Sequence, residues 1–300
     1  MVFKDKIKSA FQEAQRSICQ ALEAEDGLGK FSEELWNHES GGGGITRVIQ
    51  HGGVLEKGGV NFSAVEGEIP IFMKSHVASA ATHFFATGIS IVLHPSSPLI
   101  PIIHMNVRYF ETNGGDAWFG GGIDLTPIYV VKEDARDFHQ ALKDVCDRYD
   151  QEFYPTQKKW ADDYFFNQHR HETRGVGGIF YDYVKPADGR FSHEVLMQYA
   201  LDLTKTFVQV YVPLMNKYKA MPFTAEQKEW QLMRRGRYVE FNLVYDRGTR
   251  FGLETGGRIE SILMSLPEYA SWKYNFKPEE GSAEHATLNA LKKDVNWLES

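Results

Sequence analysis

The sequence is poor in cysteine, with only Cys19 and Cys146 in 300 residues. Their number and spacing fit neither a disulfide framework nor a zinc knuckle, so both are expected to be reduced. No apolar run reaches the roughly 18 residues that a membrane-spanning helix needs. The N-terminal segment also lacks the apolar core of a secretory signal and the acid-poor composition of a transit peptide. These absences favour a cytoplasmic protein.

An excess of positive charge is absent as well, because the formal net charge is −7. Nucleic acids and anionic membranes attract basic surfaces, so a general binder of either is excluded. The chain has no G-x-x-x-x-G-K-[ST] phosphate loop, no G-x-S-x-G nucleophile elbow, no H-E-x-x-H zinc motif and no G-x-G-x-x-G opening a β-α-β unit. The composition is that of an ordinary folded protein, with 42% hydrophobic residues, enough for a full core.

Hydrophobic periodicity predicts a mixture of strands and helices. Alternating residues between glycine and proline turns predict strands or hairpins over residues 45–65, 89–94, 100–110 and 118–123. Apolar residues at helical spacing predict helices over residues 3–22, within 133–168 and over 191–216, and a capping box at Thr224 and Gln227. The middle of the chain is therefore expected to be rich in helix.

A late hairpin is predicted after this helical middle. Residues 238–245 alternate, residues 246–249 (DRGT) are typical of a turn, and residues 250–254 form the returning strand. Short helices over residues 259–266 and 285–298 complete the chain. Strands at both ends with hairpin-length links favour an α+β fold with a mainly antiparallel sheet, in one domain spanning residues 1–300.

One predicted strand carries a polar face. His104, Asn106 and Arg108 point to the same side, because side chains of a strand alternate between its two faces. Ser90 and His94 form a second polar row, so His94 and His104 would flank one surface if the two strands pair. An arginine beside neutral donors suits an anionic, carboxylate-bearing substrate. The alternative is an ordinary solvated sheet face.

Two aspartates are candidates for proton transfer. Asp124 follows three glycines, which let a bulky group approach the backbone, although an N-cap or turn role is the common use of such an aspartate. Asp246 and Arg247 place a carboxylate and a guanidinium side by side at the predicted hairpin turn, where a turn salt bridge is the alternative.

Gly256 and Gly257 with Arg258 precede a predicted helix, so free backbone N–H groups and an arginine meet where a carboxylate or phosphate would bind. A metal site is a further alternative. Its candidate ligands are His94, His104, His139 and His169, which have no close spacing in the sequence, so the sequence itself assigns no metal.

Taken together, these segments resemble the oxygen-dependent coproporphyrinogen III oxidases of haem and porphyrin biosynthesis. The similarity runs from the first helix to the last. Its motifs are residues 39–44 (ESGGGG), 59–63 (GVNFS), 104–110 (HMNVRYF), 118–127 (WFGGGIDLTP), 174–178 (RGVGG), 234–242 (RRGRYVEFN) and 246–249 (DRGT). Ungapped motifs in the same order are far more specific than any single glycine pair.

The resemblance implies an oxidoreductase that converts the ring A and ring B propionates of coproporphyrinogen III to vinyl groups, giving protoporphyrinogen IX. Each oxidative decarboxylation would consume O2 and release CO2 and H2O2, with O2 as co-substrate and no further cofactor. It also implies a homodimer built on a large flat antiparallel sheet with helices on both faces, the dimer contact lying near the late hairpin and the following helix. The targeting extension of many eukaryotic members is expected to be missing, in keeping with a cytoplasmic location.

The resemblance also suggests roles for the candidate residues. Arg108 and the segment Gly256-Gly257-Arg258 would hold propionates, and Ser90 and Asn106 would add hydrogen bonds. His104 stands at the position of the family's proton donor. Asp246 or Asp124 would accept from the pyrrole N–H groups, and Arg247 would steady the carboxylate. Two alternatives remain: a non-catalytic tetrapyrrole-binding protein, and a metal-dependent enzyme, since the histidine positions are assigned to a divalent metal in some bacterial relatives but not in eukaryotic ones.

Overall fold

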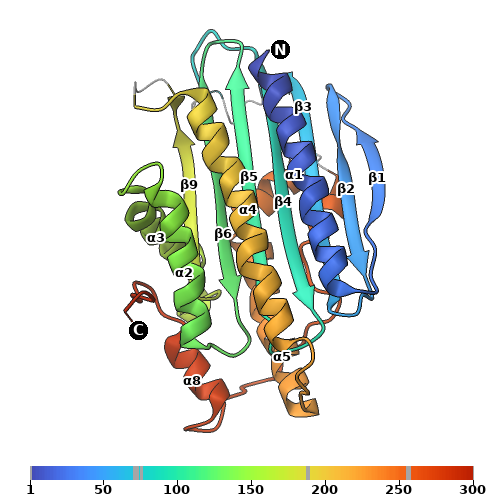
Figure 1. Ribbon diagram of the computed structural model, residues 1–300, viewed down its shortest axis with the longest axis vertical. Helices are drawn as coiled ribbons and strands as arrows, with labels where there is room; N and C mark the ends of the chain where they lie inside the picture. The colour runs from blue at the N-terminus through green and yellow to red at the C-terminus, as the bar shows by residue number, and fades with distance from the viewer. Residues whose placement is uncertain (1, 70–73, 75–76, 187–189, 255–257, 300) are drawn as a thin grey trace.

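A computed structural model of the chain describes residues 2–69, 74, 77–186, 190–254 and 258–299. Within them one antiparallel sheet dominates (Figure 1), in the strand order β1-β2-β3-β4-β5-β6-β9. Its strands are β1 (Ser32–Asn37), β2 (Gly42–Gln50), β3 (Leu55–Glu68), β4 (His83–Pro95), β5 (Ile102–Thr112), β6 (Ala117–Thr126) and β9 (Gly177–Val184). A separate short pair is formed by β7 (Phe166–Asn167) and β8 (Glu172–Thr173).

Helices lie on both faces of the sheet. They are α1 (Phe3–Asp26), α2 (Lys132–Asp147), α3 (Phe153–Tyr164), the 3-10 turn η2 (Gln168–Arg170), α4 (His193–Tyr218), α5 (Ala225–Val244), α6 (Arg247–Glu254), α7 (Ile259–Leu263) and α8 (Ala283–Ala290). The near face in Figure 1 is covered by α1 and α4, side by side, and by α2 next to α4, whereas α5 lies behind the sheet. No helix in the described ranges is long and apolar enough to cross a membrane.

The two faces of the sheet differ in polarity. On the face covered by α1, α2 and α4, side chains such as Ile91, Met105 and Val107 are fully buried against Phe11 and Phe207. Each contributes ~1.5–3 kcal/mol relative to exposure in water. The alternate residues of the same strands point to the opposite face, where polar residues and glycine stand beside a few apolar residues such as Val92 and Ile102. Alternation along the strands therefore separates a core face from a face available for chemistry.

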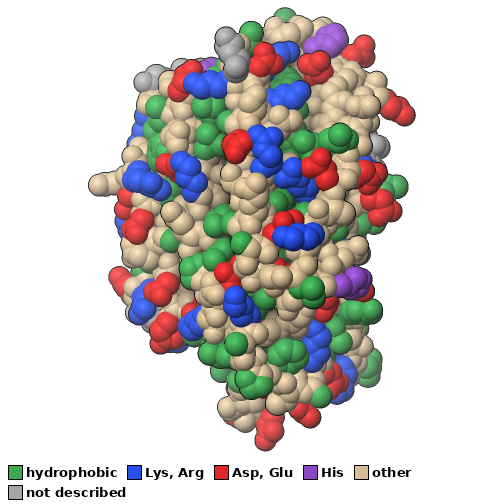
Figure 2. All heavy atoms as spheres, turned by 45° about the vertical axis from the view of Figure 1, so that its right-hand side comes forward, with side chains coloured by type: hydrophobic (Ala, Val, Ile, Leu, Met, Phe, Trp, Pro, Cys, Tyr) green, Lys and Arg blue, Asp and Glu red, His purple; other side chains and the backbone are tan. Residues whose placement is uncertain are grey.

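The outer surface has no concentrated charge on the side that Figure 2 displays. Lysine and arginine side chains are interspersed with aspartate and glutamate there. This distribution agrees with the absence of a basic surface for nucleic acid on that side.

The predicted α+β fold with a mainly antiparallel sheet between helices is confirmed, but the late hairpin is wrong. Residues 238–244 continue α5, and residues 247–254 form α6. The buried residues of α5 include Arg234, Tyr238, Phe241 and Asn242, which recur at intervals of three and four, as in an amphipathic helix. Over only eight residues, the pattern of apolar side chains in 238–245 is compatible with both the strand period and the helix period. The capping box at Thr224, which is present, begins the helix that runs through it.

Three further differences concern the placement of strands and helix ends. Strand β9 lies in the middle of the chain, where helix was expected, and β1 precedes the predicted strand region. The last helix ends at Ala290 rather than at residue 298. Most of the sheet therefore comes from the first 126 residues, and among the described residues only β9 joins it from later in the chain.

Candidate active site

The polar face of β4, β5 and β6 brings the predicted strand residues together. In the register of these strands, Val92 lies opposite His104, which lies opposite Asp124. Directly opposed residues of antiparallel strands point to the same side. The face consists of Gly88, Ser90, Val92 and His94 of β4, His104, Asn106 and Arg108 of β5, and Gly120, Gly122 and Asp124 of β6. The strands β4 and β5 do pair, so the two polar rows share one face.

His104 and Asp124 form a hydrogen-bonded pair across β5 and β6. His104 Nδ1 lies 2.8 Å from Asp124 Oδ1. A carboxylate only accepts hydrogen bonds, so Nδ1 carries the hydrogen. His104 keeps 19% of its side chain exposed, while Asp124 is 1% exposed. The pair therefore presents the imidazole to the surface and hides the carboxylate, and Asp124 is not the N-cap or turn residue of the alternative interpretation.

Arg174 completes this group from the segment between β8 and β9. Its Nη2 donates to Asp124 Oδ1 at 2.6 Å and its Nε donates to Oδ2 at 3.1 Å. Burial would raise the pKa of Asp124, but the charge of Arg174 and the hydrogen bond from His104 outweigh it, so that pKa lies below its usual value. Asp124 is therefore a buried carboxylate held in its charged form.

Aromatic rings enclose the Arg174 guanidinium. Its central carbon lies 4.4 Å from the ring centre of Phe165, 4.8 Å from that of Tyr238 and 4.7 Å from that of Phe241. Nη1 donates to Asn242 Oδ1 at 2.9 Å. A buried cation needs such compensation for its lost hydration. Because Tyr238, Phe241 and Asn242 all come from α5, this helix completes the site from behind the sheet.

Arg108 lies two rows along the polar face from His104. It donates to Asn106 Oδ1 at 2.9 Å and forms an ion pair with Asp182 of β9 at 2.7 Å. Its side chain is 36% exposed. A methyl group at Gly120 would lie 2.6 Å from Asp182 Oδ1 and 2.8 Å from Arg108 Nε, so glycine provides the space for this pair. The arrangement leaves a partly exposed cation with a fixed direction.

Asp246 occupies the junction of α5 and α6. Its Oδ2 accepts from the backbone N–H of Thr249 at 2.7 Å and from the Thr249 hydroxyl at 2.8 Å, which is an N-cap of α6. The Tyr164 hydroxyl donates to Oδ1 at 2.8 Å. Burial would raise the pKa of Asp246, but these hydrogen bonds and the charge of Arg174 lower it. Asp246 is thus a helix-capping residue whose pKa is also lowered by the charge of Arg174.

Arg247 does not form the turn salt bridge considered for the predicted hairpin. Its guanidinium lies over the Tyr164 ring, 4.9 Å from the ring centre, and its backbone N–H donates to the Tyr164 hydroxyl. The side chain is otherwise exposed. Arg247 therefore contacts Asp246 through Tyr164 rather than directly.

Arg258 is separated from Arg108 by much of the sheet. It forms an ion pair with Glu34 of β1. Four strand spacings separate β1 from β5, which corresponds to ~19 Å. Gly256 and Gly257 lie outside the described residues. Arg258 and Arg108 therefore lie at opposite parts of the polar face.

The four histidines weighed as metal ligands have different surroundings. His94 is fully buried on the polar face and its Nε2 lies 2.8 Å from the carbonyl of Ser265. Burial lowers the pKa of His94 to about 3, with a smaller contribution from the charge of Arg235. His139 lies on α2, and burial lowers its pKa to about 4. Over the described ranges, no three His, Cys, Asp or Glu side chains are arranged to hold a metal ion.

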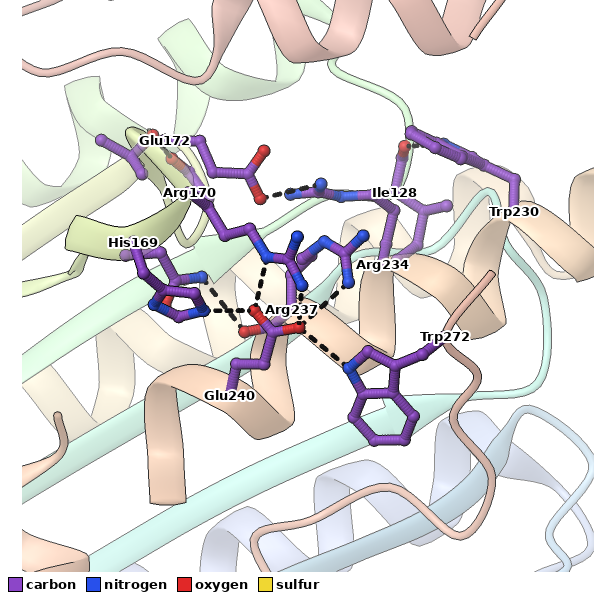
Figure 3. A network of polar contacts seen from close by, with 12 residues as sticks. Ile128, His169, Arg170, Glu172, Trp230, Arg234, Arg237, Glu240 and Trp272 are labelled. Atoms are coloured by element: carbon purple, nitrogen blue, oxygen red, sulfur yellow. Dashed lines mark hydrogen bonds and ion pairs between the residues drawn. The ribbon is translucent and has the colours of Figure 1, made fainter. Parts of the chain in front are cut away.

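His169 belongs to a polar network that fastens the β7–β8 segment to α5 (Figure 3). Glu240 of α5 accepts hydrogen bonds from His169 and Arg170 of η2. Arg234 donates to Glu172 of β8 at 2.9 Å. Burial opposes ionisation of Glu240, but hydrogen bonds from Arg170, His169 and Trp272 lower its pKa to about 2. The network therefore fixes the segment that leads directly into Arg174.

Sequence reasoning missed the partners that join the candidate residues. In the sequence, Arg174 and Asn242 stand only as the ends of two motifs and Tyr164 only marks a helix, and nothing points to Asp182 as a partner of Arg108. The one available signal was an arginine directly before Gly-Val-Gly-Gly, which marks backbone in close contact with another strand. Neither Asp124 nor Asn242 is near Arg174 in sequence, so their contact required the fold.

Comparison with known proteins shows to which family the chain belongs. A family model described as coproporphyrinogen III oxidase matches residues 6–297. The chain belongs to the coproporphyrinogen III oxidase family. It is 48% identical over 308 residues to the chloroplastic oxygen-dependent coproporphyrinogen-III oxidase of Glycine max, covering 98% of this chain and 79% of that protein.

Proteins similar to this chain also occur outside plants. The oxygen-dependent coproporphyrinogen-III oxidase of Prochlorococcus marinus (strain NATL2A) is 47% identical over 98% of this chain and 90% of its own length. That of Drosophila melanogaster is 45% identical over 98% of this chain and 78% of its own length. The resemblance drawn from the motifs is therefore confirmed over nearly the whole chain.

Proposed function

We propose that the polar face of β4, β5 and β6 is the active site of an oxygen-dependent coproporphyrinogen oxidase. The chain converts two propionates of coproporphyrinogen III to vinyl groups and yields protoporphyrinogen IX. For each propionate, –CH2–CH2–COO⁻, O2 and one proton become –CH=CH2, CO2 and H2O2. The observation that supports this site is the exposed imidazole of His104, backed by the buried Asp124 carboxylate and placed on the same face as Arg108.

Arg108 binds a propionate in this proposal. It is a partly exposed guanidinium whose direction is set by Asn106 and Asp182, and arginine binds carboxylates through two parallel N–H donors. Ser90 and Asn106 add neutral hydrogen bonds from the same face. Arg258 holds a second propionate near β1, at the other end of the same face, and Gly256 and Gly257 are proposed to add backbone N–H donors to it. A substrate with four propionates needs cations at more than one of its edges.

His104 delivers the proton that each decarboxylation consumes, so before the step it carries hydrogen on both ring nitrogens, and after the step it is the neutral tautomer with hydrogen on Nδ1. Its Nδ1 is committed to Asp124, so Nε2 is the nitrogen that meets the substrate or the reduced oxygen. Asp124 itself is enclosed and both its oxygens already accept hydrogen bonds, so it acts only through His104.

Asp246 is the carboxylate that accepts from the pyrrole N–H groups. It is partly exposed, and its Oδ1 accepts one hydrogen bond and so keeps a free lone pair. Arg247 steadies it through Tyr164. Withdrawing a pyrrole proton makes the ring rich in electrons, which lets the substrate reduce O2 directly. No metal, flavin or haem takes part in this proposal.

Assays with coproporphyrinogen III in air and without O2, each with and without a chelator, test this function. We expect one CO2 and one H2O2 for each vinyl group in air, no vinyl product without O2, and unchanged turnover after chelation. Turnover without O2 would refute the role of O2, and loss of turnover on chelation would establish the metal-dependent alternative. Tight binding with no product would leave a non-catalytic tetrapyrrole-binding protein.

The assembly is proposed to be a cytoplasmic homodimer of single-domain subunits spanning residues 1–300. Apolar side chains at the C-terminal end of α5 and on α6 and α7 support a contact there. They are Leu243, Val244, Leu253 and Ile259, between 43% and 58% exposed. Sedimentation should show a dimer for the parent protein and a monomer for Ile259→Glu, and a monomeric parent protein would contradict the homodimer.

Fluorescent fusions should stay in the cytoplasm, and a signal from an organelle would contradict that location. Two separate unfolding transitions would contradict a single domain.

A further inference from the structure

We infer that Arg174 is a positioning residue for the reaction, which acts by orienting Asp124 and, through Asp124, the imidazole of His104. The inference rests on the proposed role of His104. Arg174 does not touch the substrate, since its guanidinium is enclosed by Phe165, Tyr238 and Phe241. Its contribution is to fix which imidazole nitrogen is free and where it points.

The geometry of the Asp124 carboxylate is fully determined by its partners. Oδ1 accepts from His104 Nδ1 at 2.8 Å and from Arg174 Nη2 at 2.6 Å, and Oδ2 accepts from Arg174 Nε at 3.1 Å. Two donors from one planar group prevent the carboxylate from rotating about its bond to the chain. The lone pair that receives His104 Nδ1–H therefore keeps one direction. A carboxylate that holds a histidine in one tautomer makes a large difference to proton transfer.

The position of Arg174 is in turn fixed from two sides. Asn242 of α5 accepts from Nη1 at 2.9 Å, and the three rings pack around the guanidinium plane. On the other side, Arg174 follows β8, whose Glu172 is bound by Arg234 of α5 (Figure 3). A side chain enclosed in this way has little freedom to follow a displaced carboxylate. It is suited to guide Asp124 rather than to adapt to it.

An arginine is required for this role rather than any cation. The guanidinium offers Nε and Nη2 in a rigid fork that matches both carboxylate oxygens, whereas an ammonium is a point charge that leaves one oxygen unguided. Lysine at this position would keep the charge and lose the fork. Arg174→Lys is therefore the variant that separates orientation from simple charge compensation.

Arg235 provides a matched control. It is also a fully buried arginine, paired with the carboxylate of Glu56 and donating to the carbonyl of Pro95 at 2.9 Å. It has no contact with Asp124 or His104 among the described interactions. Arg235→Lys keeps a buried charge and loses the paired N–H donors of the guanidinium at a place that does not contact Asp124 or His104. A loss caused only by general weakening of the fold would appear in both variants.

Two measurements on Arg174→Lys and Arg235→Lys test the inference. We expect Arg174→Lys to lower kcat by about 10- to 100-fold, with KM changed less than about threefold, and Arg235→Lys to change kcat less than about threefold at equal folded fraction. In nitrogen-15 histidine NMR of the parent protein and Arg235→Lys, His104 should show hydrogen on Nδ1. Arg174→Lys should show exchange between tautomers.

Equal loss of kcat in both variants, or an unchanged His104 tautomer in Arg174→Lys, would overturn the inference. The NMR arm needs no turnover, so it also reports on Arg174→Lys if the substrate assignment is wrong. A parent protein that is inactive with coproporphyrinogen III would refute the proposed function while the tautomer comparison still decides whether Arg174 orients His104. If Arg174→Lys does not fold, Asn242→Ala, which removes the acceptor of Arg174 Nη1 and so frees the guanidinium to move, should show tautomer exchange as well and a smaller loss of kcat. An unchanged tautomer there would overturn the inference.

Discussion

Asp124 and Asp246 are two carboxylates on the same side of the sheet, but the chain holds them in different ways. Asp124 lies within a central strand, and its partners His104 and Arg174 come from segments distant in sequence. Asp246 lies between two helices, and Thr249, three residues later, supplies two of its donors. The first is a buried relay to a neighbouring side chain. The second is a local cap that retains exposure, and so can meet the substrate.

Removing Asp124 should have the largest effect, because it would leave Arg174 buried without its counter-ion. Asp124→Ala should lower the free energy of unfolding by ~3–5 kcal/mol. It should also lower kcat by about 100-fold or more, because His104 loses its orienting partner. Urea unfolding and steady-state kinetics check both effects. A stability loss below ~1 kcal/mol would mean that the buried pair does not hold the site together.

Removing His104 should separate chemistry from stability. His104→Ala should lower kcat by about 100-fold or more with a small change in KM, since the proposed proton donor is lost and the Arg174–Asp124 pair remains. His51, which is an exposed histidine away from the polar face, provides the control His51→Ala with unchanged kcat. Near-normal turnover in His104→Ala would assign proton delivery to another group.

Asp246→Ala should test whether the cap is also a reacting group. We expect kcat to fall by about 100-fold if Asp246 receives the pyrrole proton, while the unfolding free energy falls by only ~1 kcal/mol for the lost cap. Thr249→Val removes a donor to the same carboxylate and keeps the carboxylate itself. It should therefore weaken the fold slightly without a comparable loss of kcat. Equal kcat in the two variants would reduce Asp246 to a helix cap.

Arg108→Ala should act on binding. Losing charge-assisted hydrogen bonds of ~1.5–3 kcal/mol should raise KM by about 10- to 100-fold and leave kcat within a few-fold. Arg250, an exposed arginine of α6, serves as the control, and Arg250→Ala should leave KM unchanged. A fall in kcat with constant KM would place Arg108 in the chemical step instead.

The smallest expected effect is a loss of unfolding free energy at acidic pH. The pKa of Glu240 is lowered from 4.5 to about 2 in the folded protein, so its stabilising effect is complete above pH ~4.5 and is lost as pH falls towards 2. The difference in unfolding free energy between the parent protein and Glu240→Gln should therefore shrink over this range. Urea unfolding at several pH values measures it. A difference that stays constant from pH 5 to 2 would show that Glu240 is not held in its charged form.

The strand-borne half of the site was predictable because its rule is local. A period of two residues places His104, Asn106 and Arg108 on one face whatever the rest of the chain does. The helix-borne half was misassigned because residues 238–245 satisfy both periods over a short length. The role of Arg174 depends on strand β8, on α5 and on β6 at once, and no local pattern encodes a contact among three distant segments.

The glycines of the polar face restrict how this protein can be redesigned. A methyl group on Gly88 would lie 2.5 Å from the carbonyl oxygen of Val107, and one on Gly122 would lie 2.8 Å from that of Ile179. One on Gly120 would displace the Arg108–Asp182 pair. Directed evolution towards other tetrapyrroles therefore has no room for a larger side chain at these three positions. Successful libraries should keep the three glycines and vary the residues around them.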